Sequence, residues 1–123
     1  MCKLPVVVFF TVILISVCTD TPVQWTVESG GNDHYYEIIE ASWQSWDDSN
    51  ELAQQRQYQG FQGYMATITS EAENDFIKTL IQSTEGAEQY YLGGYQPPGS
   101  PEPDGNWQWI TGEPWIYSNW AAG

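Results

Sequence analysis

Apolar and polar positions recur at two different spacings along the chain, and each spacing predicts a different element. Val23, Trp25 and Val27 alternate with polar residues, which is the pattern of a half-buried strand. A cluster of turn-forming residues at 29–33 is followed by a second strand-like run at 34–40. We therefore expect an antiparallel hairpin at the start of the folded part of the chain.

Two later stretches carry the three-to-four-residue spacing of amphipathic helices. The first covers 42–57, with Ser45 as the candidate N-cap. The second covers 70–82, where Ser70 and Glu73 form the Ser-x-x-Glu pattern of a capping box. The apolar face predicted for this second helix consists of Ala72, Phe76, Ile77, Leu80 and Ile81.

Short apolar runs elsewhere predict further strands. They lie at 64–68, 90–93 and 107–110, while 83–89 is expected to be a loop. The proline-rich segment 97–105 suits no regular element and ends in an Asp-Gly turn. Because no crossover helices separate the later strands, they must pair antiparallel, and the whole pattern predicts an α+β domain.

The first 18 residues differ in kind from the rest. Lys3 precedes an almost wholly apolar run over 4–15, and Ser16-Val17-Cys18 places small residues where a signal peptidase cleaves. We therefore expect a cleaved signal peptide at 1–18, a single domain at 19–123, and a secreted, extracellular product. Two alternatives stay open: a retained membrane anchor, although the run is shorter than the roughly 20 residues of a bilayer span, and lipidation at the leader's second cysteine.

Charge narrows the partners of the expected mature domain. Its sixteen acidic residues face only Arg56 and Lys78, which gives a formal charge of −14. Such a charge repels phosphate backbones and anionic membranes, so we expect no nucleic-acid partner and no stable membrane insertion after cleavage. Both cysteines lie in the leader, which excludes disulfides, thiol catalysis and thiolate metal sites from the mature part.

Tryptophan is concentrated at the end of the chain. Four of the seven tryptophans occupy its last 17 residues, namely Trp107, Trp109, Trp115 and Trp120. They follow the pair Gly93-Gly94, and glycines let a backbone approach large flat side chains closely. This run therefore predicts a densely packed aromatic region.

Taken together and in order, six of these segments resemble the C-type lectin-like domain over about 25–123. The resemblance implies a C-type lectin-like fold, with two helices packed on antiparallel strands beside a long irregular loop region. It also implies a secreted lectin whose carbohydrate binding depends on Ca²⁺ in the family. The segments are the Tyr35-Tyr36 strand, the Ser45-Trp46 helix, Gly63 to Ile68, Glu73 to Ile77, Tyr91-Leu92-Gly93-Gly94, and Asp104 to Trp109 with Ser118-Asn119-Trp120.

The chain departs from the family pattern in two respects. Family members commonly carry disulfides, which the mature part lacks. In sugar-binding members a Glu-Pro-Asn or Gln-Pro-Asp tripeptide and a later Trp-Asn-Asp complete the principal calcium site, and neither follows Trp120 before Gly123. We therefore expect the domain to be C-terminally incomplete and its primary site to be missing. Glu102-Pro103-Asp104 precedes Trp109 and is assigned to a different loop.

Two residues are candidates for binding. Asp104 matches a carboxylate position of the family's auxiliary calcium site, and its alternative role is an ordinary Asp-Gly turn. Trp115, beside a turn proline, is the candidate exposed ring for stacking on a sugar. We expect Trp107, Trp109 and Trp120 to belong to the core.

No residue pattern favours catalysis. His34, the lone histidine, is expected to be packed and hydrogen-bonded. The carboxylate pairs Asp47/Asp48 and Glu71/Glu73 invite comparison with glycosidases, but each lies in the first turn of a predicted helix, where acids stabilise the helix dipole. We therefore expect a protein that is not an enzyme.

Three functional hypotheses follow. The first is a C-type lectin-like protein that binds carbohydrate. The second keeps that fold but binds an extracellular protein without calcium or sugar, with its acidic surface facing a basic partner. The third, a β-sandwich carbohydrate module, suits the composition but not two helices.

Overall fold

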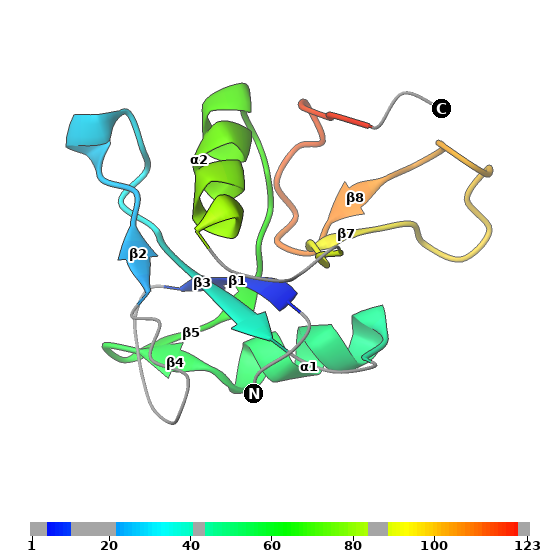
Figure 1. Cartoon of the computed structure of the whole chain (residues 1–123). Helices are drawn as coiled ribbons and strands as arrows, with labels where there is room; N and C mark the ends of the chain where they lie inside the picture. Colours follow the sequence, from blue (N-terminus) through cyan, green and yellow to red (C-terminus); the bar gives the residue numbers. More distant parts are fainter. Residues whose placement is uncertain (1–4, 11–21, 41–43, 84–88, 121–123) are drawn as a thin grey trace.

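Two α-helices and three small antiparallel sheets form the described part of the chain (Figure 1). The computed structural model describes residues 5–10, 22–40, 44–83 and 89–120. The expected α+β class, with two helices on antiparallel strands, is confirmed and is compatible with a C-type lectin-like fold. The elements are β1 (Pro5–Phe10), β2 (Val23–Gln24), η1 (Val27–Ser29), β3 (Tyr35–Glu40), α1 (Trp46–Gln55), β4 (Gln57–Tyr58), β5 (Phe61–Gln62), β6 (Tyr64–Met65), α2 (Glu71–Gln82), β7 (Gly94–Tyr95) and β8 (Gln108–Trp109).

The main sheet has the strand order β2-β3-β1-β6. Strand β1 is therefore central: it pairs with β3 from Pro5↔Glu40 to Phe10↔Tyr35, and with β6 through Val8↔Met65. This strand lies within the segment that the sequence assigns to a signal peptide. The pairing does not test cleavage, so the signal peptide stays a prediction.

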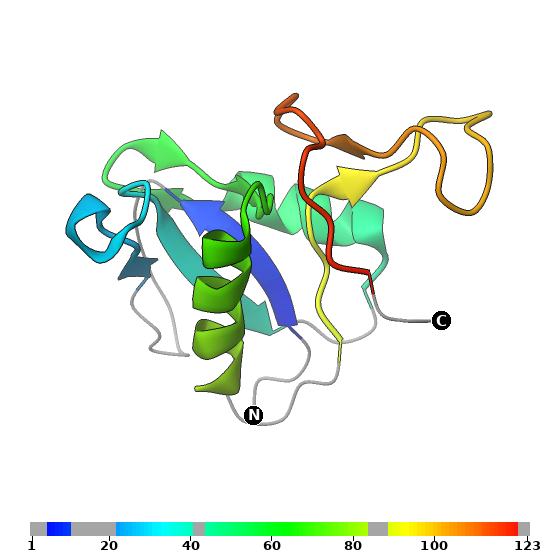
Figure 2. The same ribbon diagram turned by 90° about the horizontal axis from the view of Figure 1, so that it is seen from above.

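Strand β3 separates two apolar clusters because its side chains alternate between the faces of the sheet. Tyr36 and Ile38 belong to the cluster on the side of α2, whereas Tyr35 and Ile39 pack with the cluster on the side of α1. The two helices consequently lie on opposite sides of the main sheet (Figure 2). The sheet is therefore covered on both faces. The alternating residues of the strands and the apolar residues of the helices both contribute to the core.

Both predicted helix starts are confirmed, but the capping boxes differ. In α1 the Ser45 hydroxyl accepts from the Asp48 amide at 3.1 Å, and the Asp48 carboxylate accepts from the Ser45 amide at 3.1 Å, which completes the box. In α2 the Ser70 hydroxyl accepts from the Glu73 amide at 3.2 Å. The Glu73 carboxylate does not complete the capping box; instead it accepts a hydrogen bond from the Thr69 amide at 2.7 Å.

Helix α2 buries most of the face that the sequence predicts: Ile77 is a core residue, and Phe76, Leu80 and Ile81 pack against the same cluster. Ile77 is buried and Phe76 stacks on Trp25 at 5.5 Å between ring centroids, as the apolar spacing predicts. Ala72, however, is exposed, and Glu73 and Asn74 are buried in its place. Glu73 lies on the same side of the helix as Phe76, Ile77 and Leu80, and it can be buried there because its carboxylate accepts hydrogen bonds from neighbouring polar groups.

The predicted strands are shorter in the structure. The strand expected over 23–27 ends at Gln24, since Thr26 caps the short helix η1. The prediction of a strand over 90–93 is wrong: the strand of this region, β7, is Gly94–Tyr95. The 107–110 prediction agrees with β8.

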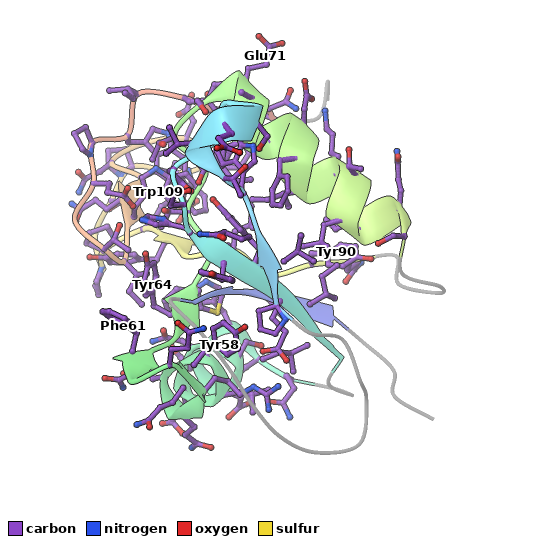
Figure 3. All side chains as sticks on the ribbon, turned by 90° about the vertical axis from the view of Figure 1, so that its left-hand side faces the viewer. Tyr58, Phe61, Tyr64, Glu71, Tyr90 and Trp109 are labelled. Carbon is purple, nitrogen blue, oxygen red and sulfur yellow. The ribbon has the colours of Figure 1, made fainter. Side chains whose placement is uncertain are left out.

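A further hairpin, β4–β5, was not predicted. Its two turn residues, Gln59 and Gly60, both have positive φ angles of 47° and 89°, the combination that favours a two-residue hairpin turn. Tyr58 of this hairpin is buried, whereas Phe61 lies on the outside of the molecule (Figure 3).

Candidate functional site

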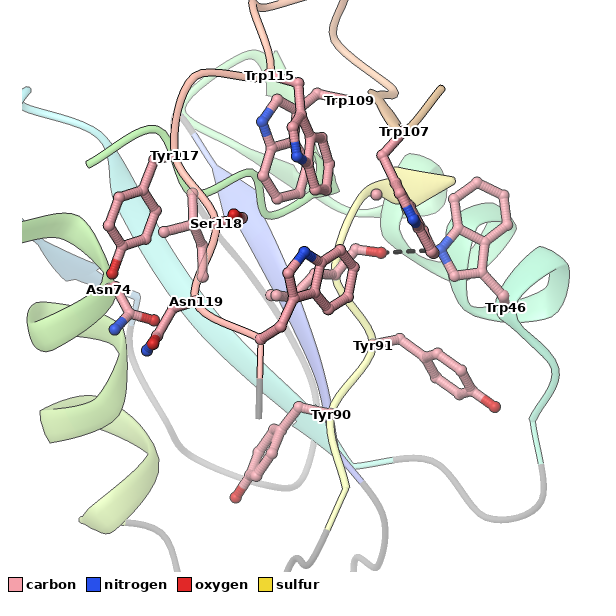
Figure 4. A pocket seen from close by; sticks show the side chains of 14 residues that line it. Trp46, Asn74, Tyr90, Tyr91, Trp107, Trp109, Trp115, Tyr117, Ser118 and Asn119 are labelled. Atoms are coloured by element: carbon pink, nitrogen blue, oxygen red, sulfur yellow. Dashed lines mark hydrogen bonds between the residues drawn. The ribbon is translucent and has the colours of Figure 1, made fainter. Parts of the chain in front are cut away.

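A cleft of about 350 Å³ lies between α2, the strand-like segment 90–95 and the C-terminal segment 115–120 (Figure 4). Eight of its lining residues are tryptophan or tyrosine, so we call it the aromatic cleft. Its lining consists of Trp46, Ile68, Asn74, Tyr90, Tyr91, Leu92, Gly94, Trp107, Trp109, Trp115, Tyr117, Ser118, Asn119 and Trp120.

Four indole rings form a continuous stack along one wall. Trp115 stacks on Trp109 with 4.2 Å between ring centroids and 28° between ring planes. On its other side it meets Trp107 at 5.7 Å and Trp120 at 6.1 Å. Stacked rings of this kind stabilise one another beyond the area they bury. The four rings therefore support one another in a single wall.

Gly94 provides the room that this stack needs. A Cβ atom at this position would lie 3.1 Å from the ring of Trp115 and 3.3 Å from the ring of Trp109. Both contacts are tighter than ordinary van der Waals contact, so a side chain here would displace the rings. The sequence expectation that glycines lie against the aromatic run is confirmed at this residue.

On another side of the cleft, hydrogen bonds to backbone carbonyls hold the side chains of Trp46 and Tyr91. The indole nitrogen of Trp46, from α1, donates to the Leu92 carbonyl at 2.8 Å (Figure 4). The Tyr91 hydroxyl donates to the Gln44 carbonyl at 3.3 Å. Together these bonds link the start of α1 to the segment 90–95.

The polar groups of the cleft are amides and hydroxyls. Asn74 projects from α2 toward Tyr117 and Asn119 (Figure 4). Its side chain is 9% exposed, and its Nδ2 has no hydrogen-bond partner among the described residues. The same holds for Nε1 of Trp109. Of the described residues that line the cleft, none carries a charged side chain.

The tryptophans of the run divide differently from the sequence expectation. Trp109 is 5% exposed and belongs to the core, as predicted. Trp120, predicted to be core, is 59% exposed, and Trp107 is only partly buried. Trp120 lies on a segment without regular secondary structure. Its ring packs against Trp107 and Trp115 at the cleft and leaves one side open to solvent. Trp115 is also partly buried and lines the cleft.

Asp104 lies outside the aromatic cleft, in the exposed loop between β7 and β8. The loop is closed by hydrogen bonds from the Gly105 amide to the Pro101 carbonyl and from Gln96 Nε2 to the Gly105 carbonyl, both at 2.8 Å. The Glu102–Pro103 peptide bond within it is cis. The turn assignment for Asp104 thus has a structural basis, and its role as a metal ligand stays a prediction.

The surroundings of Asp104 do not fit a calcium ion. Calcium takes 6–8 oxygen ligands, mostly carboxylates and carbonyls. Within the described part of the chain, no three or more His, Cys, Asp or Glu side chains are grouped so that they could hold a metal ion. Calcium is therefore an implication of the resemblance alone, and no binding step is derived through it.

Buried hydroxyls near the main sheet are held neutral. Burial, together with the adjacent Glu73 carboxylate, raises the pKa of Tyr36, whose hydroxyl donates to Glu73 at 2.7 Å. Burial and the charge of Glu113 raise the pKa of Tyr64 to about 12. Both tyrosines therefore stay protonated at physiological pH, and Tyr36 is a fixed donor to Glu73.

Sequence reasoning missed most of the cleft. Trp115 was singled out, but Asn74, Trp46 and Tyr90 were not. For Asn74 a signal was present, since an amide occupies a helix position between two residues of the expected apolar face. Trp46 and Tyr90 carry no comparable signal, because only the fold brings α1 and the segment after α2 together.

Three known proteins are similar to parts of the chain. A stretch of 61 residues is 28% identical to lithostathine-1 of Mus musculus, covering 50% of this chain and 35% of that protein. A stretch of 80 residues is 29% identical to regenerating islet-derived protein 3-gamma of Mus musculus, covering 63% of this chain and 44% of that protein. These two proteins are C-type lectin-like, so the chain is distantly similar to that family.

The third relative is much larger. The chain is 31% identical over 100 residues to halomucin of Haloquadratum walsbyi, which covers 76% of this chain but 1% of halomucin. The chain thus spans less than half the length of each of these relatives. No family model and no solved structure matches it. Neither of the two described α-helices combines the length and apolar character of a membrane span.

Proposed function

We propose that this protein is a secreted, C-type lectin-like carbohydrate-binding module that holds its ligand in the aromatic cleft. The observation that carries the proposal is the wall of four stacked indoles facing amide side chains across a cavity of about 350 Å³. The distant similarity to C-type lectin-like proteins supports the same assignment.

The chemistry of the wall suits a sugar ring. A pyranose presents C–H groups on one face and hydroxyls around its edge, so it needs flat apolar surfaces together with a few hydrogen-bonding groups. The indoles supply the first requirement. Asn74, Ser118 and Asn119 supply the second from the same cavity.

Substituting Trp120 tests this assignment. Trp120→Ala removes a 59% exposed ring from the wall, and we expect affinity for the preferred saccharide to fall about three- to tenfold, since an aromatic contact contributes roughly 0.5–1.5 kcal/mol. A glycan array first identifies the saccharide, and isothermal titration calorimetry then measures both proteins.

Phe61→Ala is the matched control. Phe61 is 54% exposed on the β4–β5 hairpin and does not line the cleft, so its removal should leave the affinity unchanged. Equal loss in both variants, or no retention of any arrayed glycan by the wild-type protein, would refute sugar binding in the cleft.

The second candidate is a protein-binding module of the same fold. The observation that favours it is Ile116, which is 78% exposed beside the aromatic cleft and presents an apolar side chain to solvent. In this case Ile116→Asp should abolish binding of an extracellular protein partner, and free saccharide should not displace that partner.

A further inference from the structure

Two hydrogen-bond donors in the wall of the aromatic cleft lack an acceptor. Asn74 Nδ2 and Trp109 Nε1 are both buried, and neither has a partner among the described residues. Leaving a buried donor without an acceptor is unfavourable, so proteins rarely keep one. Both residues line the same cavity.

The same cavity restricts the charge of that ligand. The described lining residues contain no cationic side chain that would neutralise an anion, and the chain carries a formal charge of −13. They also contain no carboxylate, the main type of oxygen ligand around calcium. An uncharged molecule with several oxygen acceptors and flat apolar faces meets all these conditions.

We infer that the aromatic cleft binds a neutral saccharide directly, with Asn74 Nδ2 and Trp109 Nε1 donating to its oxygen atoms and without a bridging calcium ion. This inference rests on the proposed function and specifies its ligand class and donors. The indoles of Trp115 and Trp120 then cover the ring faces, and the two donors select the orientation of the sugar in the cleft.

A pair of asparagines in the same region gives the test its contrast. Asn32 donates to the Tyr36 hydroxyl at 3.2 Å and to Glu73 at 3.4 Å, so its amide has partners within the protein. Asn74 Nδ2 has none among the described residues. A donor that serves the fold and a donor that serves a ligand therefore respond differently to the same substitution, Asn→Leu.

We expect Asn74→Leu to keep or raise the melting temperature, because leucine removes an unpaired polar group from a buried position and suits a helix better than asparagine. We expect it to weaken saccharide binding by roughly tenfold or more. Asn32→Leu should lower the melting temperature and leave the affinity unchanged. The full chain is titrated with neutral hexasaccharides (cellohexaose, mannohexaose and chitohexaose), with a hyaluronan hexasaccharide as the anionic comparison.

Two further measurements separate the outcomes. Trp109→Phe keeps the ring and removes its N–H, so it should also weaken binding, and excess EDTA should not. If none of the neutral hexasaccharides binds the wild-type protein, this inference is refuted. Sugar binding in the cleft then survives only if the glycan array shows another ligand that depends on Trp120.

If a hexasaccharide binds the wild-type protein and the Asn74→Leu variant equally well, the assignment of the hydrogen-bond donors is wrong. The proposal that the cleft binds a sugar is not contradicted by that result. Loss of binding with EDTA, or preference for the hyaluronan fragment, overturns the metal-free and neutral-ligand statements respectively. A lowered melting temperature for Asn74→Leu would show that the amide serves the fold.

Discussion

Gly93 and Gly94 are adjacent, and an added side chain would be unfavourable at each position for a different physical reason. A Cβ on Gly93 would lie 2.8 Å from the backbone oxygen of Met65 and 2.9 Å from Ile110. The Gly93 amide donates to the Ala66 carbonyl at 2.7 Å, and its own carbonyl accepts from Ile110 at 2.8 Å. Gly93 thus joins two segments of backbone, whereas Gly94 makes room for indole rings.

At this scale we expect Gly93→Ala to destabilise the protein by about 1–3 kcal/mol, the usual cost of overpacking, since two of the three atoms nearest to the added Cβ are backbone oxygens, which cannot move aside as a side chain can. Gly94→Ala meets only ring edges at 3.1–3.3 Å and should cost less. Urea unfolding followed by tryptophan fluorescence measures both. A larger loss for Gly94→Ala would contradict this reading of the two contacts.

Among the elements, α1 shows how a few polar groups fix a helix end. Hydrogen bonds from the Ser45 hydroxyl and amide to the Asp48 carboxylate lower the pKa of that carboxyl. The folded-state pKa then lies below the unfolded value of about 3.9. The carboxylate therefore stabilises the protein above that pH, and this contribution is lost as the pH falls through the lowered pKa.

We accordingly expect Asp48→Asn to lower the melting temperature at neutral pH, and the difference from the wild-type protein to vanish as the solution is acidified below the lowered pKa. Asp47→Asn is the control, because Asp47 lies in the same first turn without a bond to the cap. Circular dichroism melts across a pH series provide the measurement. A difference that persists unchanged in acid would exclude this account.

The whole molecule depends on a sheet that is covered on both faces. Strand β3 supplies side chains to the clusters under α1 and α2, and it pairs with β1 along its full length. Strand β1 also joins β3 to β6, so it holds together segments that are distant in the sequence.

If residues 1–18 are removed on secretion, as proposed, the sheet loses this strand. We expect the chain 19–123 to melt at a lower temperature than the chain 1–123, because β3 and β6 would lose their shared partner. Mass spectrometry of the secreted product establishes whether cleavage occurs, and thermal melts compare the two chains. Equal melting temperatures would show that β1 contributes nothing to stability.

Local sequence patterns were enough to predict several features of the fold. Ser45 and Ser70 begin the two helices because a hydroxyl before an apolar periodic run satisfies free helix amides wherever the helix lies. The hairpin before α1, the antiparallel pairing and the burial of Trp109 follow from equally local patterns.

Tertiary structure decided the rest, because it depends on which distant segments meet. The sequence could not place Trp120 at the surface, since the same sequence pattern is expected for an indole in a core and for an indole at a cleft. Nor could it show that Asn74 faces a cavity, because the segments 90–95 and 115–120 that form this cavity with α2 follow it at a distance in the sequence. A periodic pattern determines which side chains share a face of an element; only packing determines what that face meets.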